Sequence, residues 1–242
     1  MTKGSTVPKG NVKIFGGFSF PKKITVVSNK FRSLAKYNSD TQKIETTVKP
    51  LSDFQKKLIN TVWLPRTLRN PILVYGLMWF ALFGSMESST VSLVRLISTV
   101  SFFTLGFWFI SKRIAKWHGA EHMTIEAYLT EGDTSTEGIK KYSPINKRCG
   151  GRFLLPWLMV VVVFNFLNLG NWFITLGIVT ILELDRFIPM HKVPVFRQAS
   201  YLLQKYITTK EPNERELLTA QKAMLLLIEA HEELEQKQQK SL

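Results

Sequence analysis

The sequence has little cysteine and few acidic residues, and it lacks several motifs that identify enzyme classes. Cys149 is the single cysteine in 242 residues, so no disulfide can form within the chain, which fits a reducing compartment. The N-terminal region contains no apolar core of about 7–15 residues, so we expect no cleavable signal peptide. A P-loop, a G-x-G-x-x-G motif and a serine nucleophile elbow are all missing, which leaves nucleotide-driven and serine-hydrolase chemistry without support.

The scarcity of acids makes the chain basic, with 32 Lys and Arg against 18 Asp and Glu and a net charge of +14. Residues 1–70 hold fourteen basic and three acidic residues, which is +11 of that charge. Such an excess favours contact with anionic lipids on the cytoplasmic side of a membrane. We expect no nucleic-acid partner, because no recognisable nucleic-acid module accompanies the basic segment. The composition leaves self-association into a homo-oligomer open.

The mean hydropathy of +0.02 conceals long apolar runs that alternate with basic segments. This pattern predicts a mainly α, multi-pass helical membrane protein of about four spans, with a small N-terminal β-meander and a C-terminal amphipathic helix. The distribution of Lys and Arg places both termini and residues 111–152 in the cytoplasm, so the predicted location is the cell membrane. A re-entrant hairpin is an alternative for the last two runs. The four runs are Ile72–Met86, Val91–Ile110, Phe153–Leu169 and Trp172–Ile188.

Composition and periodicity divide the chain into six segments. The first is β-rich because β-branched and alternating stretches are separated by turn residues, and the second has apolar residues at helical spacing. The second segment is predicted to be an interfacial amphipathic helix, or else a surface helix docked on the meander. The segments are 1–50 (basic, β-rich), 51–70 (amphipathic helix), 71–110 (two spans), 111–152 (cytoplasmic helix and loop), 153–188 (two spans) and 189–242 (C-terminal cytoplasmic helices).

One chemical motif stands out, the H-x-x-E-H sequence formed by His118, Glu121 and His122. On a helix the two histidines lie one turn apart on the same face, where they can bind one divalent metal ion, with zinc the leading choice. Glu121 could then act as a general base in metal-assisted hydrolysis. The alternative is a polar helix end whose side chains are merely solvated. A two-histidine motif also needs a third ligand.

Glu183 is the leading candidate for that third ligand, because a carboxylate within an apolar run needs a compensating cation. Its alternative role is an ion pair with Arg186 or Arg95. Cys149 could bind zinc as a thiolate, or could simply be a small residue at a tight turn. Glu126 shares a helix face with the two histidines but could equally be solvated. The remaining histidines, at positions 191 and 231, are expected to be solvated.

These motifs resemble those of the YqhQ-like family of bacterial membrane proteins. The similarity is carried by residues 118–125 (H-G-A-E-H-M-T-I), 140–143 (K-K-Y-S), 148–150 (R-C-G) and 208–212 (T-T-K-E-P). The order and spacing agree without a gap over residues 118–151. The resemblance implies a membrane location and a metal-dependent enzyme, and the family has no established reaction.

The chain departs from the family pattern at three positions. Met123 replaces a lysine, Asn146 replaces a histidine, and Phe15 replaces an acidic residue of the opening strand. The family pattern also places an acid at Glu183, with an arginine at Arg186. If the missing histidine is a ligand in the family, this chain binds metal weakly or not at all.

Together these observations predict a metal-dependent membrane enzyme that hydrolyses a peptide or lipid-linked substrate at the cytoplasmic interface. The competing hypothesis is a non-catalytic membrane scaffold or metal sensor. Glu121 separates the two, because a catalytic site needs a base while a structural site needs only ligands.

Overall fold

The computed structural model describes residues 12–53, 55–56, 105–106, 108–147, 149–166, 171–185 and 187–241. The chain divides into two compact units. Within the described residues, the first unit combines the N-terminal strands with 109–146 and 205–241, and the second contains 105–108 and 147–204. Segments far apart in the sequence therefore build the first unit together.

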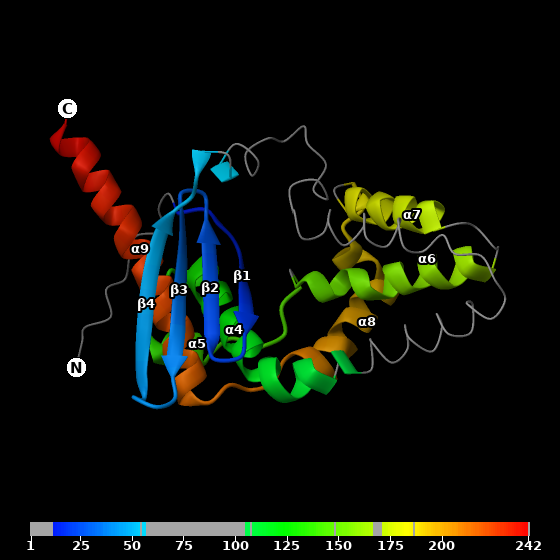
Figure 1. Ribbon diagram of the computed structural model, residues 1–242, viewed down its shortest axis with the longest axis horizontal. Coiled ribbons are helices and arrows are strands. Elements are labelled where there is room, and N and C mark those ends of the chain that lie inside the picture. The colour runs from blue at the N-terminus through cyan, green and yellow to red at the C-terminus, as the bar shows by residue number, and fades with distance from the viewer. Residues whose placement is uncertain are drawn as a thin grey trace. The chain divides into compact units, whose positions relative to one another are not determined.

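The first unit is organised on a four-stranded antiparallel sheet with the strand order β1-β2-β3-β4 (Figure 1). Short turns join neighbouring strands, as expected where β-branched runs alternate with turn residues. A β-bulge between Ile14 and Gly16 disturbs the pairing of β1 with β2, and Gly16 has φ +154°. The strands are β1 (Ile14–Phe20), β2 (Lys23–Ser28), β3 (Phe31–Asn38) and β4 (Lys43–Pro50).

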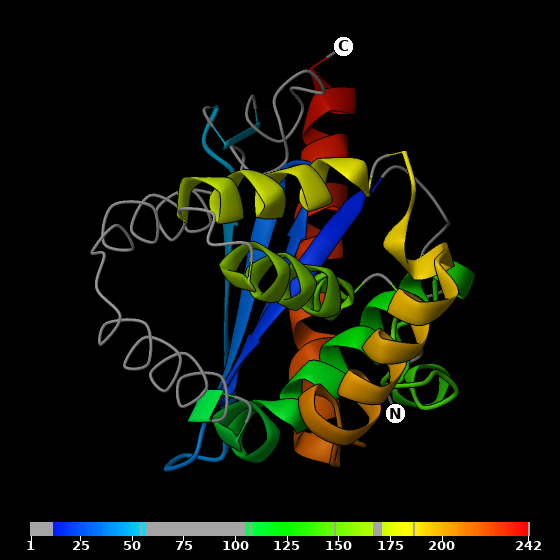
Figure 2. The same ribbon diagram turned by 90° about the vertical axis from the view of Figure 1, so that its right-hand side faces the viewer.

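Two helices, α4 (Ala115–Glu131) and α9 (Glu214–Lys240), pack on one face of this sheet (Figures 1 and 2). We call this the inner face and the opposite one the outer face. The inner-facing side chains Ile24, Val26 and Ala35 are buried against both helices. Each fully buried aliphatic side chain contributes about 1.5–3 kcal/mol, so this layer is the main stabilising feature of the unit.

Helix α9 begins with a capping box, in which the Asn213 side chain accepts from the backbone at Glu216 and Glu216 Oε2 accepts from Asn213 N at 2.9 Å. One stripe of α9 is buried, as its helical periodicity predicts, and includes Leu217, Ala220, Met224 and Leu227. The short helix α5 (Thr136–Ile139) also contacts α9.

The second unit contains helices α6 (Leu154–Phe166), α7 (Asn171–Leu184) and α8 (Pro194–Leu203). A buried ion pair joins Arg152 to Asp185 at 2.9 Å, and Asp185 Oδ1 accepts from Met190 N at 2.8 Å. Among the described residues, four short helical segments are of the 3₁₀ or π type. They are η2 (Ile110–Ile114) in the first unit, η3 (Gly150–Phe153) and η4 (Met190–Lys192) in the second unit, and η5 (Gln204–Thr208), where the chain passes from the second unit back to the first.

The described helices correct the predicted membrane fold. Where the sequence predicted the last two spans, the structure describes α6 over 13 residues and α7 over 14 residues, which is about 20 Å of helix against about 30 Å of bilayer core. Across the described ranges, no helix combines the length and the apolar character needed to cross a membrane. This finding overturns the predicted four-span, multi-pass fold and the cell-membrane location derived from it.

Other predictions fall partly outside the described residues. The first apolar run, 72–86, and most of the second, 91–104, lie there, as does most of the predicted amphipathic helix at 51–70. Ser52 caps the start of that segment, because its Oγ accepts from Gln55 N at 3.2 Å.

Candidate metal centre

Helix α4 carries the H-x-x-E-H motif and lies at the centre of the first unit. Its sequence contains no proline, and it ends where Gly132 adopts the left-handed conformation at φ +71°. Most of its residues are buried, including Trp117, Ala120 and Met123. A helix covered on several sides has little amphipathic periodicity, so the motif lies inside the fold rather than on an exposed helix face.

The two histidine rings lie together, with their centroids 4.2 Å apart. His118 Nδ1 is 3.0 Å from the carbonyl oxygen of Thr208, and His122 Nδ1 is 2.7 Å from that of Pro144. A carbonyl oxygen can only accept, so each Nδ1 must carry the proton and donate. The lone pair of each neutral ring is then on Nε2, which is how metal-binding histidines are usually oriented.

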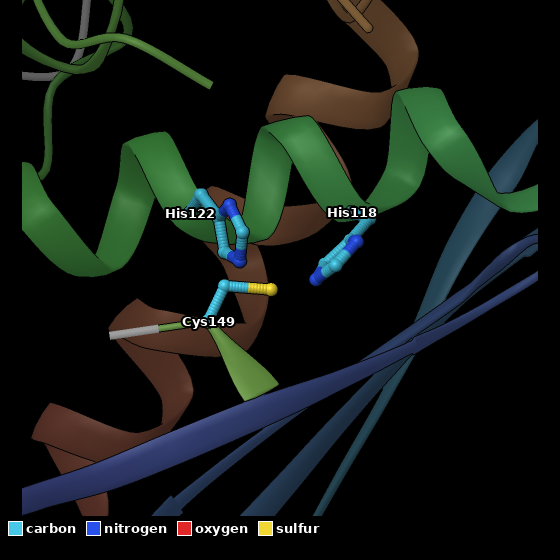
Figure 3. A group of neighbouring side chains, drawn as sticks. All are labelled: His118, His122 and Cys149. Carbon is cyan, nitrogen blue, oxygen red and sulfur yellow. The ribbon is translucent and has the colours of Figure 1, made fainter. Parts of the chain in front are cut away.

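Cys149 completes a three-membered group with these histidines. Ligand-capable atoms of His118, His122 and Cys149 all lie within 4.8 Å of one another. In Figure 3 both imidazoles project from the same side of α4, and the Cys149 sulfur points into the space between them. Three residues earlier, Asn146 Nδ2 donates to Glu126 Oε2 at 3.1 Å, which ties the loop before Cys149 to the same helix.

Burial favours the uncharged form of both histidines, which is the form that binds metal. It lowers the pKa of His122 to about 3, with the nearby His118 lowering it further and the Pro144 hydrogen bond opposing the change. Burial also lowers the pKa of His118, against the hydrogen bond to Thr208. The group could therefore hold a metal ion without first losing protons from its imidazoles.

Glu121 is buried on the side of α4 that faces β1. Ser19 Oγ donates to Glu121 Oε2, and a Cβ added at Gly17 would meet Glu121 Oε1 at 2.6 Å. Burial raises the pKa of Glu121 to about 7, and the Ser19 hydrogen bond opposes this effect. A carboxyl group in this state can give or take a proton near neutrality.

The other predicted ligands occupy different positions. Glu183 lies on α7 in the second unit and is not a member of the group that the structure brings together, where Cys149 takes the third place. Its role as a ligand stays a prediction, and Arg186 and Arg95, its alternative partners, lie outside the described residues. Glu126 accepts the hydrogen bond from Asn146.

The prediction that His231 is solvated is wrong. It is 2% exposed, its Nε2 lies 2.8 Å from Ser28 Oγ, and its ring meets Phe31 edge-on. His191 lies in the second unit and is partly exposed.

Comparison with known proteins places this chain in a family. The model of the family DUF1385, described as proteins of unknown function, matches residues 22–230. The chain belongs to this family. It is also 28% identical over 165 residues to the uncharacterized protein YqhQ of Bacillus subtilis (strain 168), an alignment that covers 60% of this chain and 51% of that protein. The chain thus spans about half the length of this relative, and no solved structure matches it.

Membership of DUF1385 confirms the resemblance to the YqhQ-like family that the motifs indicate. The matched region contains α4, Cys149 and the Thr208 segment, so every member of the His-His-Cys group lies inside it. The sequence did not reveal the roles of the Pro144 and Thr208 carbonyls or of Ser19. Pro144 directly follows the K-K-Y-S motif, and Thr208 is the first residue of the T-T-K-E-P motif. Their position at these family motifs was the one feature of the sequence that could have pointed to their roles.

Proposed function

We propose that this protein is a zinc-dependent hydrolase whose metal ligands are His118, His122 and Cys149 and whose general base is Glu121. The observation that carries the proposal is the pair of imidazoles anchored through Nδ1 to backbone carbonyls, with a thiol beside them. Imidazole and thiolate are the donors that zinc prefers. Catalytic zinc sites keep three protein ligands and leave the fourth position to water or substrate.

The ligands fit this ion for two further reasons. Both histidines are held neutral by burial, and the thiol of Cys149 is deprotonated when it binds a metal. When bound, a zinc ion supplies Lewis-acid chemistry toward a carbonyl or phosphoryl oxygen. The chain supplies the orientation of the ligands through Thr208 and Pro144, and a carboxyl group on Glu121 that is held in place by Ser19.

Metal analysis of the purified full-length chain tests the ligand set. About one zinc per chain is expected, and His118→Ala, His122→Ala and Cys149→Ala should each remove most of it. His191→Ala is the matched control, because it removes a histidine that lies outside the group. Cobalt substitution adds a direct test of the thiol, since a cobalt–thiolate absorption band should disappear in Cys149→Ala. Unchanged metal content in the double histidine variant would rule out the site.

The role of Glu121 is tested separately, with p-nitrophenyl acetate as the substrate for the zinc-loaded chain. Glu121→Gln should keep its zinc, because the residue is not a ligand, and should lose hydrolysis by about 10²–10⁴-fold, the usual contribution of a general base. Loss of zinc in this variant would instead assign Glu121 to the ligand set.

A non-catalytic metal site is the second candidate, and the burial of the group favours it. Cys149 is 8% exposed and His122 is 5% exposed, which leaves little access for a substrate. In that case the zinc-loaded chain would hydrolyse the ester no faster than the double histidine variant, and metal removal would chiefly lower the thermal midpoint.

A further inference from the structure

The outer face of the β-sheet combines exposed aromatic rings with basic side chains. Phe18 and Phe20 are each 57% exposed and point away from α4, because the residue between them, Ser19, contacts Glu121 on the inner face. They are about 7 Å apart along one strand, since residues two apart on a strand share a face. In Figure 1 the strands lie in front of α4 and α9, so this face is turned toward the viewer.

The strand register places a basic surface beside these rings. Phe20 pairs with Lys23, Lys23 with Lys36, and Lys36 with Glu45, so all four side chains lie on the outer face in one row across the sheet. Parallel rows add further basic residues from β3 and β4. The complete set of charged side chains on the outer face is Lys23, Arg32, Lys36, Lys43 and Lys49, with Glu45 as the one acid.

Glu45 compensates little of this charge. It is 3.8 Å from Lys36 and also accepts from Asn38 Nδ2 at 2.9 Å, and both charged side chains are about half exposed. Exposed pairs of this kind are weak and leave the face positive. The middle row carries Phe18, Thr25 and Leu34, which form an uncharged strip between the basic rows.

We propose that the outer face of the sheet binds single-stranded nucleic acid, with bases stacked on Phe18 and Phe20 and phosphates on the basic rows. Charge complementarity favours an anionic partner, and two exposed rings about 7 Å apart on one strand favour a partner with planar groups that can stack on them. A nucleic-acid single strand provides both, and sheets that bind single strands use this combination of aromatic platforms and cationic grooves. This surface is built from residues of all four strands, so it can be recognised only when the strand register is known. For that reason it matches no linear nucleic-acid motif in the sequence. It is independent of the metal centre on the inner side.

Fluorescence anisotropy with a labelled oligothymidylate of about fifteen nucleotides tests this on the full-length chain, within the site sizes known for such surfaces. Binding should weaken as salt rises from about 50 to 200 mM. Phe18→Leu and Phe20→Leu should each weaken it about tenfold, because leucine keeps the apolar contact but cannot stack. Phe187→Leu is the control, since Phe187 is 81% exposed in the second unit.

Charge is tested by Lys23→Gln and Arg32→Gln. Each should reduce the slope of log affinity against log salt by about 0.7, the value for one lost phosphate contact on a single strand. Lys237→Gln, an exposed change on α9, should leave the slope unaltered. Circular dichroism and the thermal midpoint verify that each variant is folded.

Three results would each overturn the proposal. The first is no binding of the oligonucleotide at low salt. The second is binding that both leucine variants preserve, which would reduce the face to a non-specific polyanion site. The third is preferential binding of vesicles containing phosphatidylserine, which would assign the face to a lipid surface instead.

Discussion

Gly119 is the residue whose substitution should reveal most about the metal centre. It lies between the two histidines on α4, and a Cβ built at this position would overlap the backbone carbonyl oxygen of Lys210. That carbonyl belongs to a segment fixed by the Lys210 N–Ala115 O hydrogen bond of 3.0 Å, so it cannot rotate away like a flexible side chain. Gly119→Ala should therefore displace the segment that contains Thr208.

The size of the effect follows from two opposing contributions. Overpacking against a rigid neighbour costs up to about 3 kcal/mol, and replacing glycine by alanine within a helix returns about 1 kcal/mol. A net loss of about 2 kcal/mol should lower the thermal midpoint by about 4–8 °C in a chain of this size. Because Thr208 orients His118, zinc affinity should also fall by about 10–100-fold, as when other groups that orient a metal ligand are lost.

Thermal denaturation followed by circular dichroism, together with zinc titration, measures both consequences. Gly106→Ala is the matched control, because Gly106 is also helical but a Cβ there would meet no atom within 4 Å. That change should leave the midpoint equal or slightly raised. A Gly119→Ala protein that melts no lower than wild type and binds zinc equally well would refute the reasoning.

Three further predictions concern stability. Leu227→Ala, which empties a fully buried position of α9, should lower the free energy of unfolding by about 2–5 kcal/mol in urea denaturation. Arg152→Ala should cost about 3–5 kcal/mol because it removes the guanidinium that lies 2.9 Å from the buried Asp185 carboxylate, while Asp185→Asn combined with Arg152→Ala should recover part of the loss. Burial, with Lys30 adding to it, lowers the pKa of His231 below its unfolded value of about 6.5. The unfolded chain then binds the extra proton, so stability should fall as pH decreases from about 7 to 5, and the fall should be shallower in His231→Asn.

The sequence predicted the elements of the first unit well where local patterns determine them. The β-branched run at 24–27 lies in β2, and Gly132 ends α4 in the left-handed conformation that glycine adopts readily. The apolar residues of α9 recur at the helical period, which made the helix recognisable in the sequence. The same period places them on one face of the helix, and that face packs on the sheet. These are properties of neighbouring residues along the chain.

The errors arose where the outcome depends on distant residues. The apolar runs that end at Leu169 and begin at Trp172 have the composition of spans, but among the described residues no helix there has the length and apolar character needed to cross a membrane. The approach of Cys149 to the histidines was also missed, because it depends on how a loop returns to α4 and no local pattern encodes that return. The role of Glu183 as a ligand stays a prediction. His231 is buried because Ser28, about two hundred residues earlier, supplies its hydrogen bond.

The hydrogen bond from His118 to Thr208 links the motif to a residue that is 90 positions later in the chain. During synthesis on the ribosome, α4 therefore emerges well before the carbonyl group that orients its first histidine. Helix α9, which shares the inner face of the sheet with α4, follows later still. A nascent chain that stops before Thr208 has the H-x-x-E-H sequence but neither the anchor of His118 nor the second helix of the core. Under the proposed function, tight metal binding therefore requires that translation has passed Thr208, and chains released before that point should remain metal-poor and accessible to proteases.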